Sequence, residues 1–261
     1  MTNFKMKMNL TVIAVIITAI FSLGITSCTD SSDKKNAATA SVDSVIVSAE
    51  QTALREKVLT AEEQAALTPD LVIQSLKEGN SRFMKNNITS RDHSSMVRNA
   101  AGGQYPKAVI LSCLDSRVPV EDVFDKGIGD LFIARVAGNF VNEDILGSME
   151  FGCKVSGAKL ILVLGHESCG AIKAAIDDVK MGNITAMLEK IKPAVIKSQD
   201  FGGEKKSKND AFVEYAAKNN VLNTIETLKA KSSILKEMVN KGEIKIVGAY
   251  YNINTGEVIF I

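Results

Sequence analysis

Two short apolar runs, residues 108–111 and 160–164, each lead directly into residue types that bind metal ions. The first run is followed by Cys113, and the second by His166 and Cys169. Runs of this length and composition predict buried β-strands. Two thiolates and one imidazole therefore come from neighbouring strand ends, and together they are three of the four ligands of a tetrahedral zinc site.

The fourth ligand decides what such a site can do. A structural zinc site closes its shell with four protein ligands, whereas a catalytic site keeps one position for water or substrate. The other histidine, His93, lies in a polar stretch, Cys153 fits a buried small hydrophobe, and Cys28 belongs to the N-terminal segment. The fourth donor is therefore Asp115 or a solvent molecule, and either leaves the metal reactive.

Three motifs occur in a fixed order: Cys-x-Asp-Ser-Arg from Cys113, Arg-Val-Ala-Gly-Asn from Arg135 and His-x-x-Cys-Gly from His166. Together they resemble the β-class carbonic anhydrases, and the resemblance covers residues 68–261. It implies a zinc lyase, with one Zn²⁺ per subunit held by Cys113, His166 and Cys169; the N-terminal segment described below predicts a bacterial, exported member of this class. The implied reaction is reversible hydration of carbon dioxide to bicarbonate and a proton, by attack of a zinc-bound hydroxide.

Asp115 and Arg117 are the predicted catalytic pair. Asp115 lies two residues from Cys113 and can accept a hydrogen bond from the attacking water, while the planar fork of Arg117 keeps the carboxylate ionised and oriented. A structural ion pair at a strand end is the alternative. If Arg117 releases it, Asp115 can also bind zinc as an alternate fourth ligand, a closed state that the resemblance includes.

The resemblance also implies two groups that bind substrate: the side chain of Gln104 and the backbone amide of Gly170. One departure from the family pattern concerns regulation. Some members carry an allosteric bicarbonate pocket built on a tryptophan, an arginine and a tyrosine. Arg135 and Tyr251 match the last two, but Ile110 stands at the tryptophan position and the chain contains no tryptophan, which argues against this form of inhibition.

The N-terminus has the composition of an export signal. Lys5 and Lys7 precede an apolar run from residue 8 to residue 25, which ends in Ile-Thr-Ser before Cys28. This order predicts a lipoprotein-type signal peptide over 1–27, lipidation of Cys28, and a periplasmic or cell-envelope location. A plain secretory signal and an uncleaved membrane anchor are the alternatives.

The rest of the chain predicts an α/β fold with an N-terminal helical arm. Residues 28–43 form a polar, flexible tether, residues 44–67 the helical arm with Thr60 and Glu63 as a capping box, and residues 68–261 the catalytic domain. Short apolar runs that alternate with helical segments predict a mostly parallel central sheet flanked by helices. We expect a loop over 86–106, a single helix over 184–198 and a terminal hairpin over 258–261.

Composition limits the partners. A formal charge of +1 and the lack of basic clusters argue against nucleic acid. The resemblance implies carbon dioxide and bicarbonate as ligands and a homodimer or higher even oligomer, with membrane contact only through the lipid anchor. Two alternatives remain: a hydrolase of carbonyl sulfide or carbon disulfide on the same site, and a non-catalytic zinc-binding lipoprotein. The second predicts a histidine-rich loop, and the chain has two histidines in total.

Overall fold

The computed structural model describes residues 57–261. The predicted signal peptide, Cys28, the tether and residues 44–56 of the predicted arm lie outside the described residues. Within residues 57–261, no helix combines the length and the apolar character that crossing a bilayer requires.

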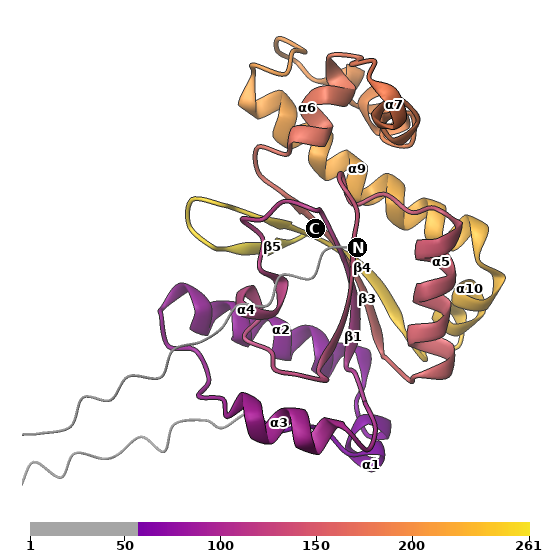
Figure 1. The fold of residues 1–261 in the computed structure, drawn as a ribbon. Helices are drawn as coiled ribbons and strands as arrows, with labels where there is room; N and C mark the ends of the chain where they lie inside the picture. The colour runs from indigo at the N-terminus through magenta and orange to yellow at the C-terminus, as the bar shows by residue number, and fades with distance from the viewer. Residues whose placement is uncertain (1–56) are drawn as a thin grey trace, which may run out of the picture. The chain divides into compact units, whose positions relative to one another are not determined.

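A five-stranded sheet with the strand order β2-β1-β3-β4-β5 forms the centre of the structure (Figure 1). The first four strands are parallel, and only β5 runs antiparallel to its neighbour β4. The predicted, mostly parallel sheet and its terminal hairpin are therefore confirmed. The strands are β1 (Ala108–Ser112), β2 (Leu131–Arg135), β3 (Leu160–His166), β4 (Lys245–Tyr251) and β5 (Val258–Phe260).

Helices cover both faces of the sheet, which explains why β1 and β3 are apolar without alternation. Every residue of these two strands is buried. The helices are α1 (Ala61–Ala65), α2 (Pro69–Met84), α3 (His93–Ala100), α4 (Val120–Val123), α5 (Glu143–Glu150), α6 (Gly170–Ile176), α7 (Gly182–Leu188), α8 (Lys192–Lys197), α9 (Asp210–Lys231) and α10 (Ser233–Asn240). A π-helical turn, η1 (Phe151–Val155), extends α5, and a 3₁₀ turn, η2 (Ser198–Asp200), follows α8.

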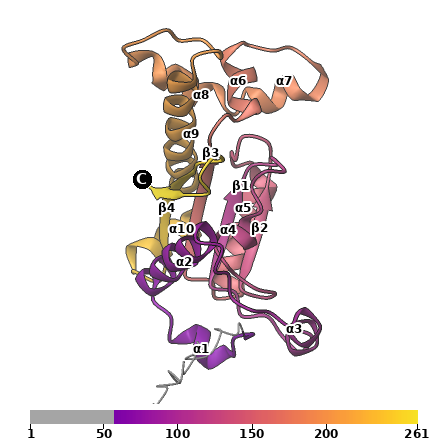
Figure 2. The ribbon, with the colours of Figure 1, turned by 90° about the vertical axis from the view of Figure 1, so that its left-hand side faces the viewer.

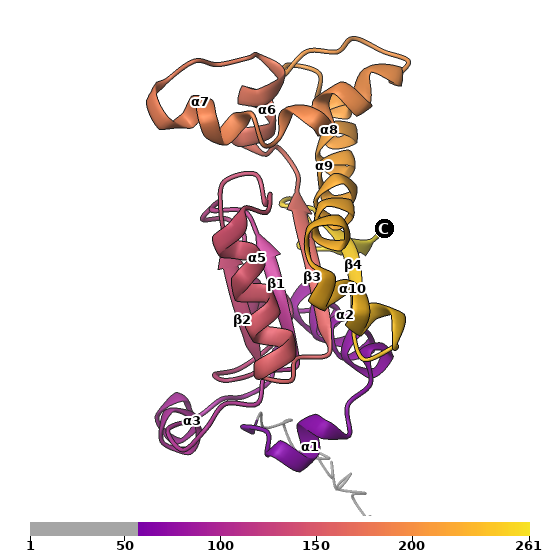
Figure 3. The ribbon, with the colours of Figure 1, turned by 90° about the vertical axis from the view of Figure 1, so that its right-hand side faces the viewer.

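Alternate side chains of each strand enter different cores. Val109 and Leu111 of β1 pack with residues of α9 and α10 on one face, and Ile110 packs with residues of α2 and α4 on the other. The helices α6, α7 and α8 gather with the first half of α9 beyond the carboxyl ends of the strands (Figure 2). The second half of α9 lies along the sheet beside α10 (Figure 3).

Polar side chains cap the N-termini of α1 and α5. The Thr60 hydroxyl accepts from the Glu63 amide and the Glu63 carboxylate accepts from the Thr60 amide, so the capping box of α1 is confirmed. Asn142 caps α5 in the same way, because its side-chain oxygen accepts from the Ile145 amide at 3.0 Å.

Two expectations about helices were wrong. The predicted loop over 86–106 contains the helix α3. Its cap is Asp92, and its only buried side chain is Met96. Because the helix is mostly polar, it has no periodic pattern of apolar residues from which it could be predicted. The single helix predicted over 184–198 is two helices, α7 and α8. The chain turns between them, and Pro193 lies in the first turn of α8 as its second residue, where its fixed φ fits a helix.

Candidate metal centre

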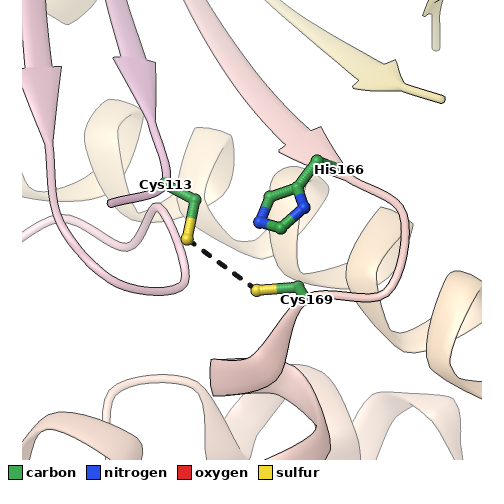
Figure 4. Close-up of side chains that lie close together, drawn as sticks. All are labelled: Cys113, His166 and Cys169. Atoms are coloured by element: carbon green, nitrogen blue, oxygen red, sulfur yellow. Dashed lines mark hydrogen bonds between the residues drawn. The ribbon is translucent and has the colours of Figure 1, made fainter. Parts of the chain in front are cut away.

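The sheet brings the three predicted ligands together. Cys113 directly follows β1, and His166 is the last residue of β3; since β1 and β3 are paired parallel neighbours, both side chains lie at the same edge. Cys169 is the N-cap of α6 and faces them across a short turn (Figure 4). The two sulfur atoms and the imidazole nitrogen lie within 4.8 Å of one another, and all three residues are buried.

The geometry and chemistry of this group fit a zinc ion. The Cys113 and Cys169 Sγ atoms lie 3.9 Å apart, close to the spacing of about 3.8 Å that two bonds of about 2.3 Å to a tetrahedral ion impose. The His166 Nδ1 atom lies 2.9 Å from the Glu167 carbonyl oxygen. That contact holds the proton on Nδ1 and leaves a lone pair on Nε2. Nε2 is buried and has no hydrogen-bond partner in the part of the chain that the structure describes, as a nitrogen reserved for a metal would be.

The two thiols do not share the same electrostatic environment. Hydrogen bonding with the Cys169 sulfur lowers the pKa of Cys113, and the Gly138 amide, 3.3 Å from Cys113 Sγ, acts in the same direction. The pKa of Cys169 is raised, because its thiol is hydrogen-bonded to the Cys113 sulfur and because it is buried. A cation that binds both sulfurs as thiolates must displace the thiol protons.

Asp115 forms a bidentate pair with Arg117. The guanidinium Nε and Nη2 atoms donate to the two carboxylate oxygens at 2.9 and 2.7 Å, and the Arg117 amide donates to the same carboxylate at 2.9 Å. These bonds hold the pKa of Asp115 well below its ordinary value. Its Oδ2 atom lies 3.9 Å from Nε2 of His166, so an ionised carboxylate borders the position of the metal. The catalytic and closed-state roles of Asp115 stay predictions.

Arg135 has a function in the structure that sequence reasoning missed. Its side chain donates from Nε to the Cys113 carbonyl at 2.9 Å and from Nη2 to the Asp115 carbonyl at 2.5 Å. The last residue of β2 therefore fixes the backbone of the loop after β1. The resemblance had matched Arg135 to a bicarbonate pocket, and nothing in the sequence indicates that its partners are main-chain oxygens.

The two predicted substrate-binding groups lie in different places. Gly170 is the exposed first residue of α6, beside Cys169, so its amide borders the metal centre. Gln104 is exposed and precedes β1, so it lies at the amino ends of the strands, opposite the metal centre. Its neighbours Gly103 and Tyr105 line a cleft there with residues 58–62. Within one chain, the structure does not bring Gln104 to the metal centre.

The two remaining candidates lie away from the centre. His93 begins α3. Cys153 is 2% exposed in η1, and burial raises its pKa to about 12. The expectation of a buried Cys153 is confirmed.

Comparison with known proteins identifies the family. The family model of the carbonic anhydrases matches residues 108–258. Carbonic anhydrase 2 of Mycobacterium tuberculosis is 36% identical over 195 residues, which cover 71% of this chain and 89% of that protein. The chain belongs to the β-class carbonic anhydrases. It is therefore an enzyme of that family, and all three candidate metal ligands and the Asp115–Arg117 pair lie inside the matched region.

Further relatives share the sequence or the fold of this carbonic anhydrase. The carbonic anhydrase of Mycolicibacterium smegmatis is 32% identical over 191 residues, covering 71% of this chain and 89% of its own. The β-carbonic anhydrase of Coccomyxa, solved with acetazolamide, superimposes with a TM-score of 0.58 at 24% identity over 75% of this chain and 86% of its own. One of two β-carbonic anhydrases of Sordaria macrospora, described as tetrameric, gives a TM-score of 0.58 at 21% identity over 64% and 86%.

Proposed function

We propose that this carbonic anhydrase binds one Zn²⁺ through Cys113, His166 and Cys169 and hydrates carbon dioxide reversibly to bicarbonate and a proton. The observation that carries the proposal is the set of three buried donor atoms within 4.8 Å, one of them a ring nitrogen that has no hydrogen-bond partner among the described residues. When bound, zinc lowers the pKa of a water from about 15.7 toward 7 and so supplies a nucleophile at ordinary pH.

The residues around the centre orient that reaction. Asp115 accepts the hydrogen of the attacking water and so directs its lone pair at the carbon, and Arg117 keeps the carboxylate ionised and pointing inward. Gly170 is exposed, and its amide donates to the substrate oxygen on which negative charge develops. If Arg117 lets go, Asp115 can turn to the metal and exclude the water, since its Oδ2 atom already lies 3.9 Å from Nε2 of His166.

We also propose that two copies of the chain form each functional unit, in a homodimer or a higher even oligomer. Because Gln104 lies at the amino ends of the strands, its side chain can reach a metal centre only when that centre belongs to a second chain. The edge strand β2 supports this arrangement, because an apolar groove of about 710 Å³ lies along it between Phe132 and Phe151. Phe151 is 53% exposed there and nearby Val155 is 70% exposed.

The proposed location of the enzyme rests on the N-terminal sequence alone. Lys5, Lys7 and the apolar run before Cys28 support export and lipidation of Cys28. Anchoring by lipid would place hydration of carbon dioxide in the periplasm or at the cell envelope.

Stopped-flow hydration of carbon dioxide by the zinc-loaded protein, measured across pH, tests the activity. We expect Asp115→Asn to lower kcat about 100-fold, because proton orientation by a fixed group contributes a factor of this order, and Arg117→Ala to lower it in the same direction. Asp178→Asn is the matched control, since it removes an exposed carboxylate that is paired with Lys192 and is not part of the metal centre.

Each outcome of this experiment has a defined meaning. A zinc-loaded parent without hydration activity at alkaline pH would remove the carbon dioxide assignment, and parallel assays with carbonyl sulfide and carbon disulfide would then test the hydrolase alternative. Asp115→Asn and Arg117→Ala variants as fast as Asp178→Asn would remove the catalytic pair. A protein that binds no zinc would overturn the metal centre itself.

A further inference from the structure

The loop between β2 and α5 supplies a hydrogen bond to one of the candidate metal ligands. The Gly138 amide donates to the Sγ atom of Cys113 at 3.3 Å. Gly138 has a φ of +82° and Asn139 a φ of +39°, so both adopt the left-handed conformation. A Cβ atom at Gly138 would lie 2.3 Å from Cδ1 of Ile191. The loop is therefore tightly packed, and its strained conformation must be held by its surroundings.

Two side chains of α9 hold this loop from behind. The Asn220 side-chain amide donates to the Gly138 carbonyl at 2.8 Å, and the Thr224 hydroxyl donates to the Asn139 carbonyl at 3.3 Å. The donors are four residues apart, so they lie on the same face of the helix. Asn220 is 1% and Thr224 2% exposed, and the Asn220 Oδ1 atom has no hydrogen-bond partner. Among residues 57–261, the Gly138 carbonyl is thus the only hydrogen-bond partner of the Asn220 side chain.

The same helix also contacts the strand that carries His166. A Cβ atom at Gly165 would lie 2.7 Å from Cγ2 of Val221, so α9 approaches β3 closely one residue before His166. Asn220 and Val221 are adjacent in α9. One helix therefore fixes the position of the loop that binds Cys113 and of the strand that ends in His166.

We propose that Asn220 is a positioning residue for the metal centre, with Thr224 in support: it holds Gly138 so that its amide donates to the Cys113 thiolate. This inference rests on the proposed zinc site. An N–H donor draws electron density from a thiolate, and the thiolate then neutralises a bound cation less. Partners one shell outside the ligands commonly set metal affinity and activity by factors of 10 to 100. Without Asn220, the Cys113 sulfur should donate more strongly and the loop should be less ordered.

Cobalt substitution tests the inference with a readout other than activity. The parent and three variants are loaded with Co²⁺, and the thiolate-to-cobalt charge-transfer band is recorded together with Zn²⁺ affinity by chelator competition. Asn220→Leu removes the donor and keeps the number and branching of the side-chain heavy atoms, and Thr224→Val is an isosteric removal of the second donor. Asn219→Leu is the matched control, because the Asn219 side chain lies on the same helix and donates to Ser198 at 2.9 Å.

We expect the band of Asn220→Leu to move to longer wavelength, that of Thr224→Val to move less in the same direction, and that of Asn219→Leu to stay in place. Zinc affinity should fall about 10-fold in Asn220→Leu, because the loop that positions Cys113 is less ordered and this loss outweighs the stronger donation by the sulfur. If Asn220→Leu does not fold, Thr224→Val decides the question. Parent-like bands and affinities in both variants would overturn the inference while leaving the zinc site intact. A parent that binds no cobalt would overturn the zinc site, and with it this inference.

Discussion

Asp125 carries a negative charge that is fully buried, away from the metal centre. Its carboxylate accepts from the Thr89 amide at 3.0 Å and from the Thr89 hydroxyl and Arg82 Nε at 2.6 Å, and it is paired with Arg91. Its side chain is 0% exposed. Burial would raise the pKa of Asp125, but these donors outweigh it and hold the pKa at about 2. The carboxylate thereby fixes the segment before α3 to the end of α4.

The Asp125→Asn variant should lose about 3 kcal/mol of unfolding free energy at pH 7, because it leaves Arg91 and Arg82 without their anion. The native pKa of Asp125 lies below the ordinary value of about 3.9, so its stabilisation is complete above about pH 4 and is lost as the pH falls toward 2. Urea unfolding at several pH values should therefore show the parent and the variant converging in acid.

Asp70→Asn is the control for this measurement, since Asp70 forms an exposed pair with Lys245 and its loss should cost under about 1 kcal/mol. A gap between parent and Asp125→Asn that stays constant from pH 7 to pH 2 would contradict the argument.

At the scale of single residues, the sequence predicted the site residues that end or follow a strand, but it missed the residues whose side chains bind main-chain atoms. Cys113 and His166 were predictable because each follows an apolar run. Arg135 and Asn220 were not, because they bind carbonyl oxygens that only the folded chain brings to them.

At the scale of elements, α9 packs unusually close to the sheet. Cβ atoms placed at Gly165 of β3 and Gly248 of β4 would each lie 2.7 Å from a methyl group of Val221. The absence of a side chain at these two glycines therefore allows α9 to approach the sheet closely, and a larger residue at either position would require α9 to shift.

Gly165→Ala should lower the unfolding free energy by about 2 kcal/mol through overpacking and should weaken zinc binding, because it pushes α9 away from the strand that ends in His166. Val221→Ala alone should also destabilise, since it leaves a cavity. The double variant should be more stable than the sum of the two losses predicts, by about 1 kcal/mol. Thermal and chemical unfolding of all four proteins measure this coupling.

Gly147→Ala is the matched control, because a Cβ there meets nothing within 4 Å. In the interior of α5, it should stabilise by up to about 1 kcal/mol. Strictly additive losses for Gly165→Ala and Val221→Ala would contradict close contact between α9 and β3.

The order of the elements was largely predictable and their breaks were not. Strands such as β3 are recognisable because burial on both faces makes every residue apolar. The break between α7 and α8 depends on how the chain turns over the first half of α9, and α3 depends on a cap at Asp92. The first feature depends on tertiary contacts and the second on a polar cap, so neither can be predicted from the periodicity of apolar residues.

At the scale of the whole molecule, the groove beside β2 offers a test of assembly. Phe151→Glu places a charge on its exposed apolar wall and should shift the protein toward the monomer, which light scattering after size exclusion detects. Activity should fall in parallel if Gln104 is supplied by a second chain. Val97→Glu, at an exposed residue of α3 outside this groove, is the control. An unchanged oligomer in Phe151→Glu would exclude this face as the contact.

The N-terminal prediction is tested in a bacterial host. Cys28→Ser removes the thiol that lipidation requires, so the mass of the attached lipid should be lost. The variant should then either leave the membrane fraction or keep its uncleaved signal peptide. Ser27→Ala keeps a small residue before the cleavage site and should behave as the parent. A parent without attached lipid would exclude lipidation and leave the secretory signal and the uncleaved anchor.

The pairing of β1 with β3 has a consequence for the path by which the chain acquires its metal. Ser112 aligns with Leu164 in this ladder, and the two halves of the centre belong to segments that stay apart until the intervening crossover has closed. A slip of one residue would turn the strand's side chains to the other face. Contacts between distant segments form slowly, so we expect the complete metal site to form late in folding. Metal binding would then indicate that β1 and β3 have paired in the correct register.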